Sequence, residues 1–141
     1  GLNIASALAG AKAAEDVAAF PGKITLVDGK LRHHETPSFG ASTHLANMLI
    51  QVMSRDSEKV AILNIKPPLL NNGVNVEKVL SVCNDLGYKI SMAPKGVIEK
   101  GTSKVDILLD EGAFGWEPSL YILAHNPLEL IDRCHQVLSS F

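Results

Sequence analysis

The fold of this chain is organised around the stretch Pro37-Ser-Phe-Gly-Ala-Ser-Thr-His44 and the segment that follows it. A loop is expected to become a helix near Gly40, Ser42 and Thr43. This junction offers free backbone N–H groups, hydroxyl groups and the positive end of a helix dipole, which together can hold an anion such as a phosphate. The other interpretation is a capped core helix with an ordinary surface histidine at position 44, because Gly, Ser and Thr are common at helix starts.

A helix is predicted directly after this loop, ending near Asp56. Its apolar residues recur every three or four positions, which places them on one face that can be buried against the rest of the protein. His44 is expected on the first turn, close to whatever the loop holds. The apolar face consists of Leu45, Met48, Leu49, Val52 and Met53.

Composition and charge indicate a single domain over residues 1–141 with a substantial core. Hydrophobic residues make up 46% of the chain and charged residues 20%, and the net charge is −2. The basic residues are scattered, which argues against a nucleic-acid surface on this chain. No apolar run reaches the ~18 residues that span a membrane, and no secretory signal is recognisable. Cys83 and Cys134 lack CxxC spacing, so we expect free thiols and a cytoplasmic location.

Before the central stretch, the sequence predicts two short helices and a β-hairpin. The Ala-rich segments Leu2–Leu8 and Ala13–Phe20 are interpreted as helical. The dipeptide Asp28-Gly29 predicts a tight turn between strands at 23–27 and 30–35. The chain starts abruptly on a structured segment without Met, so we expect it to be the C-terminal part of a longer protein.

After the central helix, strands and helices alternate. The helix from Val76 is expected to end at Gly87, and the last helix starts at Asn126, with Glu129 completing its cap. The mixture predicts an α/β fold with a mixed sheet and helices on both faces. His135, on the last helix, is interpreted as a surface residue. Buried strands are expected over 60–65, 88–93, 105–109 and 120–124, with loops over 94–104 and 110–118.

Three polar groups are candidates for one site. They are Lys23 at a strand start, the Gly40–His44 loop and the acidic Asp110–Glu117 loop. Phosphate requires N–H donors and a cation, and a divalent metal requires hard oxygen ligands. No nucleophile–base pair is evident, and no Walker, G-x-G-x-x-G or zinc-finger spacing occurs. The residues alone therefore predict a domain that binds a small anionic ligand.

Asn64 interrupts the apolar run 60–65 near its end, where ligands often meet a sheet. Two interpretations stay open for it. Its amide contacts a ligand, or it satisfies backbone groups nearby.

Five motifs in order resemble the ThiN family, the thiamine-phosphate synthase domain common in archaea. This resemblance implies a three-layer α/β/α sandwich with a mixed sheet, of the AraD or class II aldolase-like type. It also implies a reaction in which hydroxymethylpyrimidine diphosphate and thiazole phosphate give thiamine phosphate and pyrophosphate. The motifs are Asn3-Ile-Ala-Ser-Ala-Leu8, Glu15-Asp-Val-Ala-Ala-Phe-Pro-Gly-Lys-Ile24, Phe39-Gly-Ala-Ser-Thr-His44, Asn64-Ile65 and Asp110-x-Gly-x-x-Gly-x-Glu-Pro118.

The resemblance implies which residues bind the ligand, with the phosphate in the loop before His44. No metal ligand and no cofactor are expected. If the domain is a synthase, the resemblance implies His44 and Lys23 as catalytic residues and Mg²⁺ as a requirement. The implied ligand-binding residues are Asn3, Lys23, Gly40, Ala41, Ser42, Thr43, His44, Asn64, Asp110, Gly112 and Glu117.

Two departures from the family pattern favour a sensor over a catalyst. Lys23 stands where the family motif has Arg, and Lys lacks the bidentate fork of Arg. The loop over 95–104 is too short for the helix that synthase domains usually carry there. We therefore expect a thiamine-phosphate-binding effector domain of a transcriptional regulator, with DNA bound through a separate N-terminal helix-turn-helix domain, as a homodimer. The alternative is an active synthase domain. A class II aldolase-like enzyme is disfavoured because the sequence has no cluster of metal-binding histidines.

Overall fold

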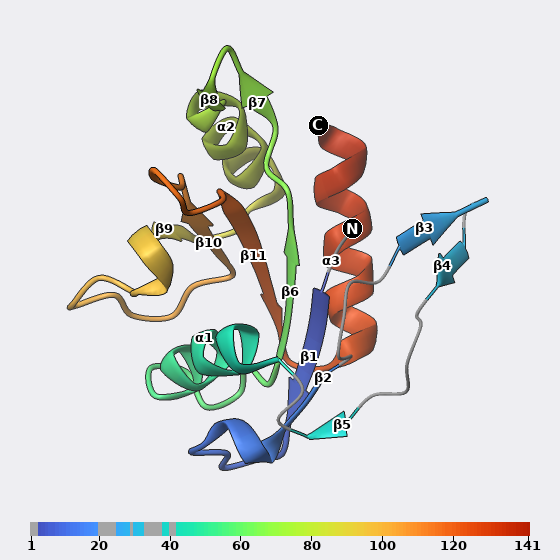
Figure 1. Cartoon of the computed structure of the whole chain (residues 1–141), viewed down its shortest axis with the longest axis vertical. Helices are drawn as coiled ribbons and strands as arrows, with labels where there is room; N and C mark the ends of the chain where they lie inside the picture. The colour runs from blue at the N-terminus through green and yellow to red at the C-terminus, as the bar shows by residue number, and fades with distance from the viewer. Residues whose placement is uncertain (1–2, 20–24, 29, 33–37, 40–41) are drawn as a thin grey trace.

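The computed structural model describes residues 3–19, 25–28, 30–32, 38–39 and 42–141. It has the predicted α/β architecture, with a central mixed sheet and helices on both faces (Figure 1). Helix α1 (Thr43–Met53) covers one face, while α2 (Val76–Leu86) and α3 (Pro127–Ser140) cover the other. None of the described helices is long and apolar enough to cross a bilayer.

The main sheet has seven strands in the order β5-β2-β1-β6-β11-β10-β9. Every neighbouring pair is antiparallel except β10 and β9, which are parallel. The carboxyl ends of β6 and β10 therefore lie at the same edge as the start of β1 and of β11. The strands are β1 (Asn3–Ala7), β2 (Val17–Ala19), β5 (Ser38–Phe39), β6 (Ala61–Ile65), β9 (Ile90–Met92), β10 (Ile107–Asp110) and β11 (Ser119–Ala124).

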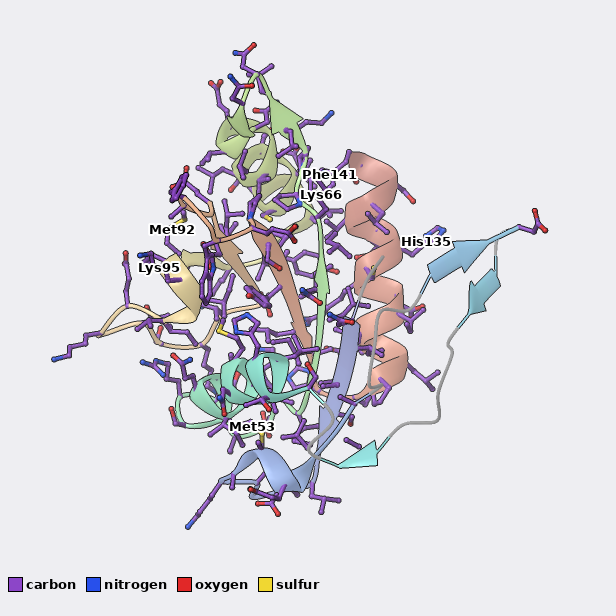
Figure 2. All side chains as sticks on the ribbon, viewed as in Figure 1. Met53, Lys66, Met92, Lys95, His135 and Phe141 are labelled. Carbon is purple, nitrogen blue, oxygen red and sulfur yellow. The ribbon has the colours of Figure 1, made fainter. Side chains whose placement is uncertain are left out.

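Both faces of the sheet are buried. Successive side chains on a strand point to opposite faces, and helices cover each face. On β11, Tyr121 and Leu123 pack towards α1, while Leu120, Ile122 and Ala124 pack towards α2 and α3. Side chains fill the space on each side of the sheet (Figure 2). This double burial explains why the central strands read as continuous apolar runs.

The predicted end of α2 at Gly87 and the predicted Asn126 cap of α3 are confirmed, and α2 has a further cap, Asn75, that was not predicted. The Asn75 side chain accepts a hydrogen bond from the backbone N–H of Lys78, and Gly87 ends α2 with φ 78° in the left-handed region. Asn126 accepts from the N–H of Glu129, and Pro127 occupies the first turn of α3. Helix α1 ends at Met53, slightly before the predicted end. His135 is exposed on α3, as expected (Figure 2).

The helices predicted over Leu2–Leu8 and Ala13–Phe20 were wrong. The first segment is strand β1, and the second holds one 3₁₀ turn, η1 (Ala14–Asp16), followed by β2. Strand β1 pairs with both β2 and β6, and these pairings outweigh the helix propensity of alanine. The small side chains of Ala5 and Ala19 are buried in the core beneath α1.

Two hairpins lie outside the main sheet. The predicted hairpin is confirmed as β3 (Thr25–Val27) paired with β4 (Lys30–Arg32), with Asp28 at φ 50° in its turn. A second hairpin pairs β7 (Leu69–Leu70) with β8 (Gly73–Val74). The loop predicted over 94–104 is confirmed apart from a short 3₁₀ turn, η2 (Pro94–Gly96).

Candidate ligand-binding pocket

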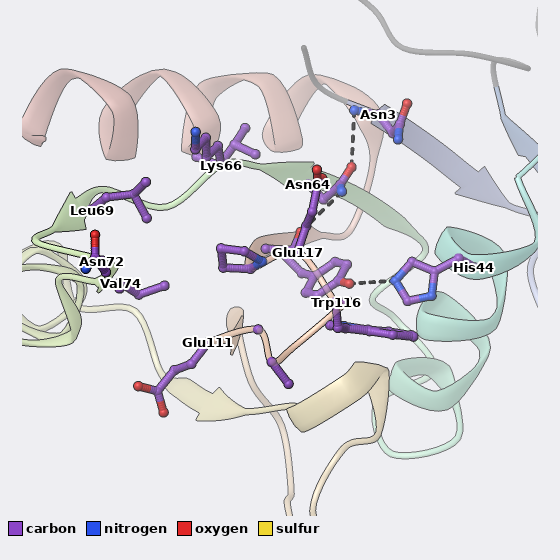
Figure 3. A pocket seen from close by; sticks show the side chains of 18 residues that line it. Asn3, His44, Asn64, Lys66, Leu69, Asn72, Val74, Glu111, Trp116 and Glu117 are labelled. Carbon is purple, nitrogen blue, oxygen red and sulfur yellow. Dashed lines mark hydrogen bonds between the residues drawn. The ribbon is translucent and has the colours of Figure 1, made fainter.

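A pocket of about 980 Å³ opens at the edge where β6 and β10 end. Its walls come from the starts of β1, α1 and β11, the β7–β8 hairpin and the loop between β10 and β11 (Figure 3). Segments far apart in the sequence therefore meet there. The lining residues used below are Asn3, His44, Asn64, Lys66, Glu111, Gly112, Trp116, Glu117, Ser119 and Tyr121.

The sheet register aligns the polar residues on the floor of this pocket. Asn64 is paired with Asn3 on one side and with Tyr121 on the other. Paired residues point to the same face of a sheet, so these three side chains form a row on the α1 face. The first turn of α1 lies above this row and carries His44.

Asn64 satisfies groups nearby and also lines the pocket. Its Oδ1 accepts a hydrogen bond of 3.2 Å from the backbone N–H of Asn3, and its Nδ2 donates one of 3.2 Å to Oγ of Ser119 (Figure 3). The first of these bonds bears out the interpretation that the amide serves local backbone. Asn64 also lines the pocket, and a contact between its amide and a ligand stays a prediction.

His44 and Tyr121 form a hydrogen-bonded pair in the pocket wall. Nε2 of His44 lies 2.7 Å from the hydroxyl of Tyr121 (Figure 3). Burial raises the pKa of Tyr121, a hydrogen bond with Ser119 partly offsets this, and the charge of Asp110 raises the pKa further. The phenol is protonated at neutral pH and can donate to the imidazole. This contact fixes one ring nitrogen of His44.

Trp116 holds the imidazole from another direction. The two rings meet edge to face, with centroids 5.8 Å apart and planes at 78°. Trp116 belongs to the loop between β10 and β11, which the sequence predicts as an acidic loop. The structure thus makes this loop an aromatic wall of the pocket.

Asp110 lies behind that wall. Its side chain is 1% exposed and does not line the pocket. One carboxylate oxygen, Oδ2, accepts from Nε1 of Trp116 at 2.8 Å and from the N–H of Gly96 at 3.1 Å. The other, Oδ1, accepts from the N–H of Gly112 at 2.9 Å. The carboxylate is therefore engaged by the protein itself.

Gly112 is required by the shape of the loop. Its φ of +77° lies in the left-handed region, and an added Cβ would lie 2.8 Å from the carbonyl oxygen of Trp116 and 2.8 Å from the nitrogen of Pro118. No larger residue fits without moving the backbone.

Charge in the described lining is mixed. Glu111 and Glu117 are exposed carboxylates at the mouth, and Lys66 is the one Lys or Arg among the described lining residues. Across the part of the chain that the structure describes, no group of three or more His, Cys, Asp or Glu is arranged to hold a metal ion.

The structure brings together five of the predicted site residues. Ser42 and Thr43 are described at the start of α1 but do not line the pocket, and Ser42 makes no side-chain cap. Lys23, Gly40 and Ala41 lie outside the described residues. The five that line the pocket are Asn3, His44, Asn64, Gly112 and Glu117.

Several lining residues were not predicted from the sequence, among them Tyr121, Ser119, Trp116 and Lys66. Tyr121 and Ser119 sit in an apolar strand, and only the strand's alternation placed them on the α1 face. Trp116 and Lys66 belong to no periodic pattern. The single Trp of the chain, in an acidic loop that also contains Gly112 and Gly115, was nevertheless a signal that could have pointed to the site.

Comparison with known proteins identifies the family. The family model described as "Thiamine-phosphate synthase ThiN" matches residues 1–136. The chain belongs to the ThiN family. The Thiamine-phosphate synthase ThiN of Methanothermobacter thermautotrophicus is 26% identical over 147 aligned positions, covering 90% of this chain and 73% of that protein.

Two solved structures share the fold of this ThiN-family chain. The crystal structure of the C-terminal domain of protein MJ0236 aligns with a TM-score of 0.78 at 22% identity, covering 99% of this chain and 81% of that one. The crystal structure of the C-terminal domain of phosphomethylpyrimidine kinase aligns with a TM-score of 0.77 at 21% identity, covering 97% and 84%. In this ThiN-family chain, the pocket described above lies at the edge where β6 and β10 end.

Proposed function

We propose that this ThiN-family chain is a thiamine-phosphate-binding effector domain of a transcriptional regulator. The observation that carries the proposal is the character of the pocket, whose described lining combines two aromatic rings, two carboxylates and one lysine. Thiamine phosphate has a permanently positive thiazolium ring, which suits Trp116 and Tyr121 as well as the carboxylates of Glu111 and Glu117. Neither precursor carries that cation.

The precursors place a different demand on a site. Together they bring a diphosphate and a monophosphate, and a synthase has to stabilise the departing pyrophosphate. Among the described lining residues, Lys66 is the one lysine or arginine, and Glu111 and Glu117 add negative charge. This balance favours the finished, partly cationic product over two anionic reactants. The phosphate of the product is proposed to bind at the loop before α1, beside His44, with Lys23 as a further contact.

A second observation supports binding without catalysis. Gln51 on α1 holds the segment after η2, because its Nε2 donates to the carbonyl of Gly96 at 2.8 Å and its Oε1 accepts from the N–H of Ile98 at 3.1 Å. Residues 95–104 do not line the pocket. The segment in which synthase domains are expected to carry an extra helix is therefore fixed against α1.

An active synthase domain is the second candidate. The retained His44 and the activity in the family's name favour it, with Lys23 then replacing Arg in a catalytic role and Mg²⁺ required. The DNA-binding domain and the homodimer remain predictions that rest on the resemblance to regulators of this family.

Calorimetry and a turnover assay separate the two candidates. Titration with thiamine phosphate is expected to show binding, and incubation with both precursors and Mg²⁺ is expected to yield no thiamine phosphate by chromatography. Formation of product at a steady rate would reject the effector proposal in favour of the synthase. Glu117→Gln is expected to weaken binding by about twofold to fivefold through the lost ion pair, whereas the matched control Glu99→Gln, outside the lining, leaves it unchanged.

The phosphate position has its own test. Ser42→Asp places a negative charge at the start of α1, so affinity for thiamine phosphate should fall by roughly tenfold or more through like-charge repulsion. The control Ser57→Asp lies on an exposed turn beyond the end of α1 and is expected to bind normally. Equal affinity for both variants means that the phosphate binds elsewhere.

A further inference from the structure

We propose that Asp110 is a positioning residue for the ligand site. Its buried carboxylate joins the two segments that contact the His44 imidazole and thereby sets the orientation of that ring, without touching the ligand. This inference rests on the proposed function only for its binding assay, since the orientation of His44 is a property of the unliganded protein.

The first segment is the loop between β10 and β11. Trp116 in that loop packs edge to face on the His44 ring, and its Nε1 donates to Oδ2 of Asp110 at 2.8 Å. The N–H of Gly112 donates to Oδ1 at 2.9 Å, which fixes the start of the same loop. A charged acceptor strengthens both bonds. The position of the indole is therefore determined from within the protein.

The second segment is η2. The N–H of Gly96 donates to the same Oδ2 at 3.1 Å. A Cβ at Gly96 would lie 2.9 Å from Cε1 of His44, so the backbone there is in close contact with the imidazole. One carboxylate oxygen thus accepts from both segments that contact the ring.

Asp110 also acts on the third neighbour of His44. Tyr121 bonds to Nε2 of the imidazole, and its pKa is raised by burial and further by the negative charge of Asp110. A tyrosine phenol is protonated at neutral pH in any case and can donate to His44, so Asp110 bears on this neighbour only through its charge. Three contacts of the imidazole are thus linked to Asp110. Trp116 and Gly96 are linked to it by hydrogen bonds, and Tyr121 is linked to it through the charge of the carboxylate.

The test uses Asp110→Asn, Trp116→Phe, the double variant, and Asp132→Asn as a control on the exposed side of α3. Asparagine retains one carbonyl oxygen, so at least one of the three donors loses its acceptor. Trp116 is the only tryptophan in the chain, so its fluorescence reports on the loop directly. Nuclear magnetic resonance of the imidazole reports on His44 without any ligand.

In Asp110→Asn we expect a red-shifted emission of Trp116, lower anisotropy and displaced ring signals of His44. Affinity for thiamine phosphate should fall by roughly tenfold or more, and by clearly less in the Trp116→Phe background, because part of the effect passes through the indole. Asp132→Asn should behave as the parent protein. Unchanged emission and ring signals, or an equal loss of affinity in both backgrounds, would overturn the proposal.

Trp116→Phe keeps the test decisive if Asp110→Asn does not fold. This variant leaves the bonds of Asp110 to the Gly96 and Gly112 backbone, and the His44 signals should still move. Unchanged signals would contradict the proposal. Absence of thiamine-phosphate binding in the parent protein would reject the proposed function instead, while the ligand-free spectra would still decide the role of Asp110.

Discussion

Gly112→Ala and Gly115→Ala form a matched pair that tests how tightly the pocket loop is built. Both glycines lie in the loop between β10 and β11, with φ of +77° and +73°. An added Cβ at Gly115 meets nothing within 4 Å, whereas at Gly112 it lies 2.8 Å from two backbone atoms, one of Trp116 and one of Pro118. The two substitutions therefore share the conformational cost and differ in the steric one.

The expected magnitudes follow from that difference. A non-glycine residue in the left-handed region costs about 1–2 kcal/mol, which both variants should show. At Gly112, ordinary contact at 3.4 Å requires the backbone to move by about 0.6 Å. Overpacking of this kind adds about 1–3 kcal/mol, so Gly112→Ala should lose about 2–5 kcal/mol of unfolding free energy in total.

Urea-induced unfolding measures both losses, followed by circular dichroism and by the fluorescence of the single tryptophan. Gly112→Ala should also weaken thiamine-phosphate binding, because the shift displaces Trp116 in the pocket wall. Gly115→Ala should bind almost as the parent protein does. Equal losses of stability in the two variants would refute the reasoning, since the loop would then be free to adjust around Gly112.

Two further predictions concern buried groups outside the pocket. Burial raises the pKa of the Cys83 thiol to about 11 and raises that of Cys134, so neither should react with a disulfide reagent at pH 8 until the protein is unfolded in urea. Rapid reaction in the native state would contradict this burial. Burial also raises the pKa of Asp106. A hydrogen bond from the backbone N–H of Lys89 and the positive charges of Lys59 and Arg133 outweigh this effect, so the pKa of Asp106 lies below its usual value. The Asp106 carboxylate stabilises the fold above its unfolded pKa near ~4, and this contribution is lost as pH falls through the folded pKa. Lys59 keeps Asp56 and Arg133 keeps Glu129 as a partner, so Asp106→Asn should cost about 1–2 kcal/mol at pH 7 and much less at low pH in urea titrations. A loss that is independent of pH would exclude this ion-pair contribution.

Local signals predicted much of the second half of the fold. The Asn126 cap of α3 and the left-handed Gly87 at the end of α2 were predictable because each depends on residues within one helical turn. Helix α1 and strand β6 were predicted because burial shapes the local sequence. A helix with one buried face has apolar residues every three or four positions, and a strand buried on both faces is a continuous apolar run. The motif set also indicated the ThiN family.

The candidate site was predicted only in part. His44, Asn64 and Gly112 came from motifs, whereas Tyr121 and Trp116 became visible only once β11 and its preceding loop were placed beside α1. Their roles depend on contacts across 77 and 72 positions of sequence, for which no short-range pattern exists.

The sequence by itself therefore determined helices α1, α2 and α3, the Asn126 cap, the Gly87 end of α2 and the α/β class, because short-range sterics and hydrogen bonding govern these features. Tertiary structure decided that Asn3–Ala7 is a strand, since its pairing with β2 and β6 outweighs local propensity. It also decided the surroundings of His44 at the start of α1. A buried Asp110, engaged by three donors, holds the wall against which His44 lies.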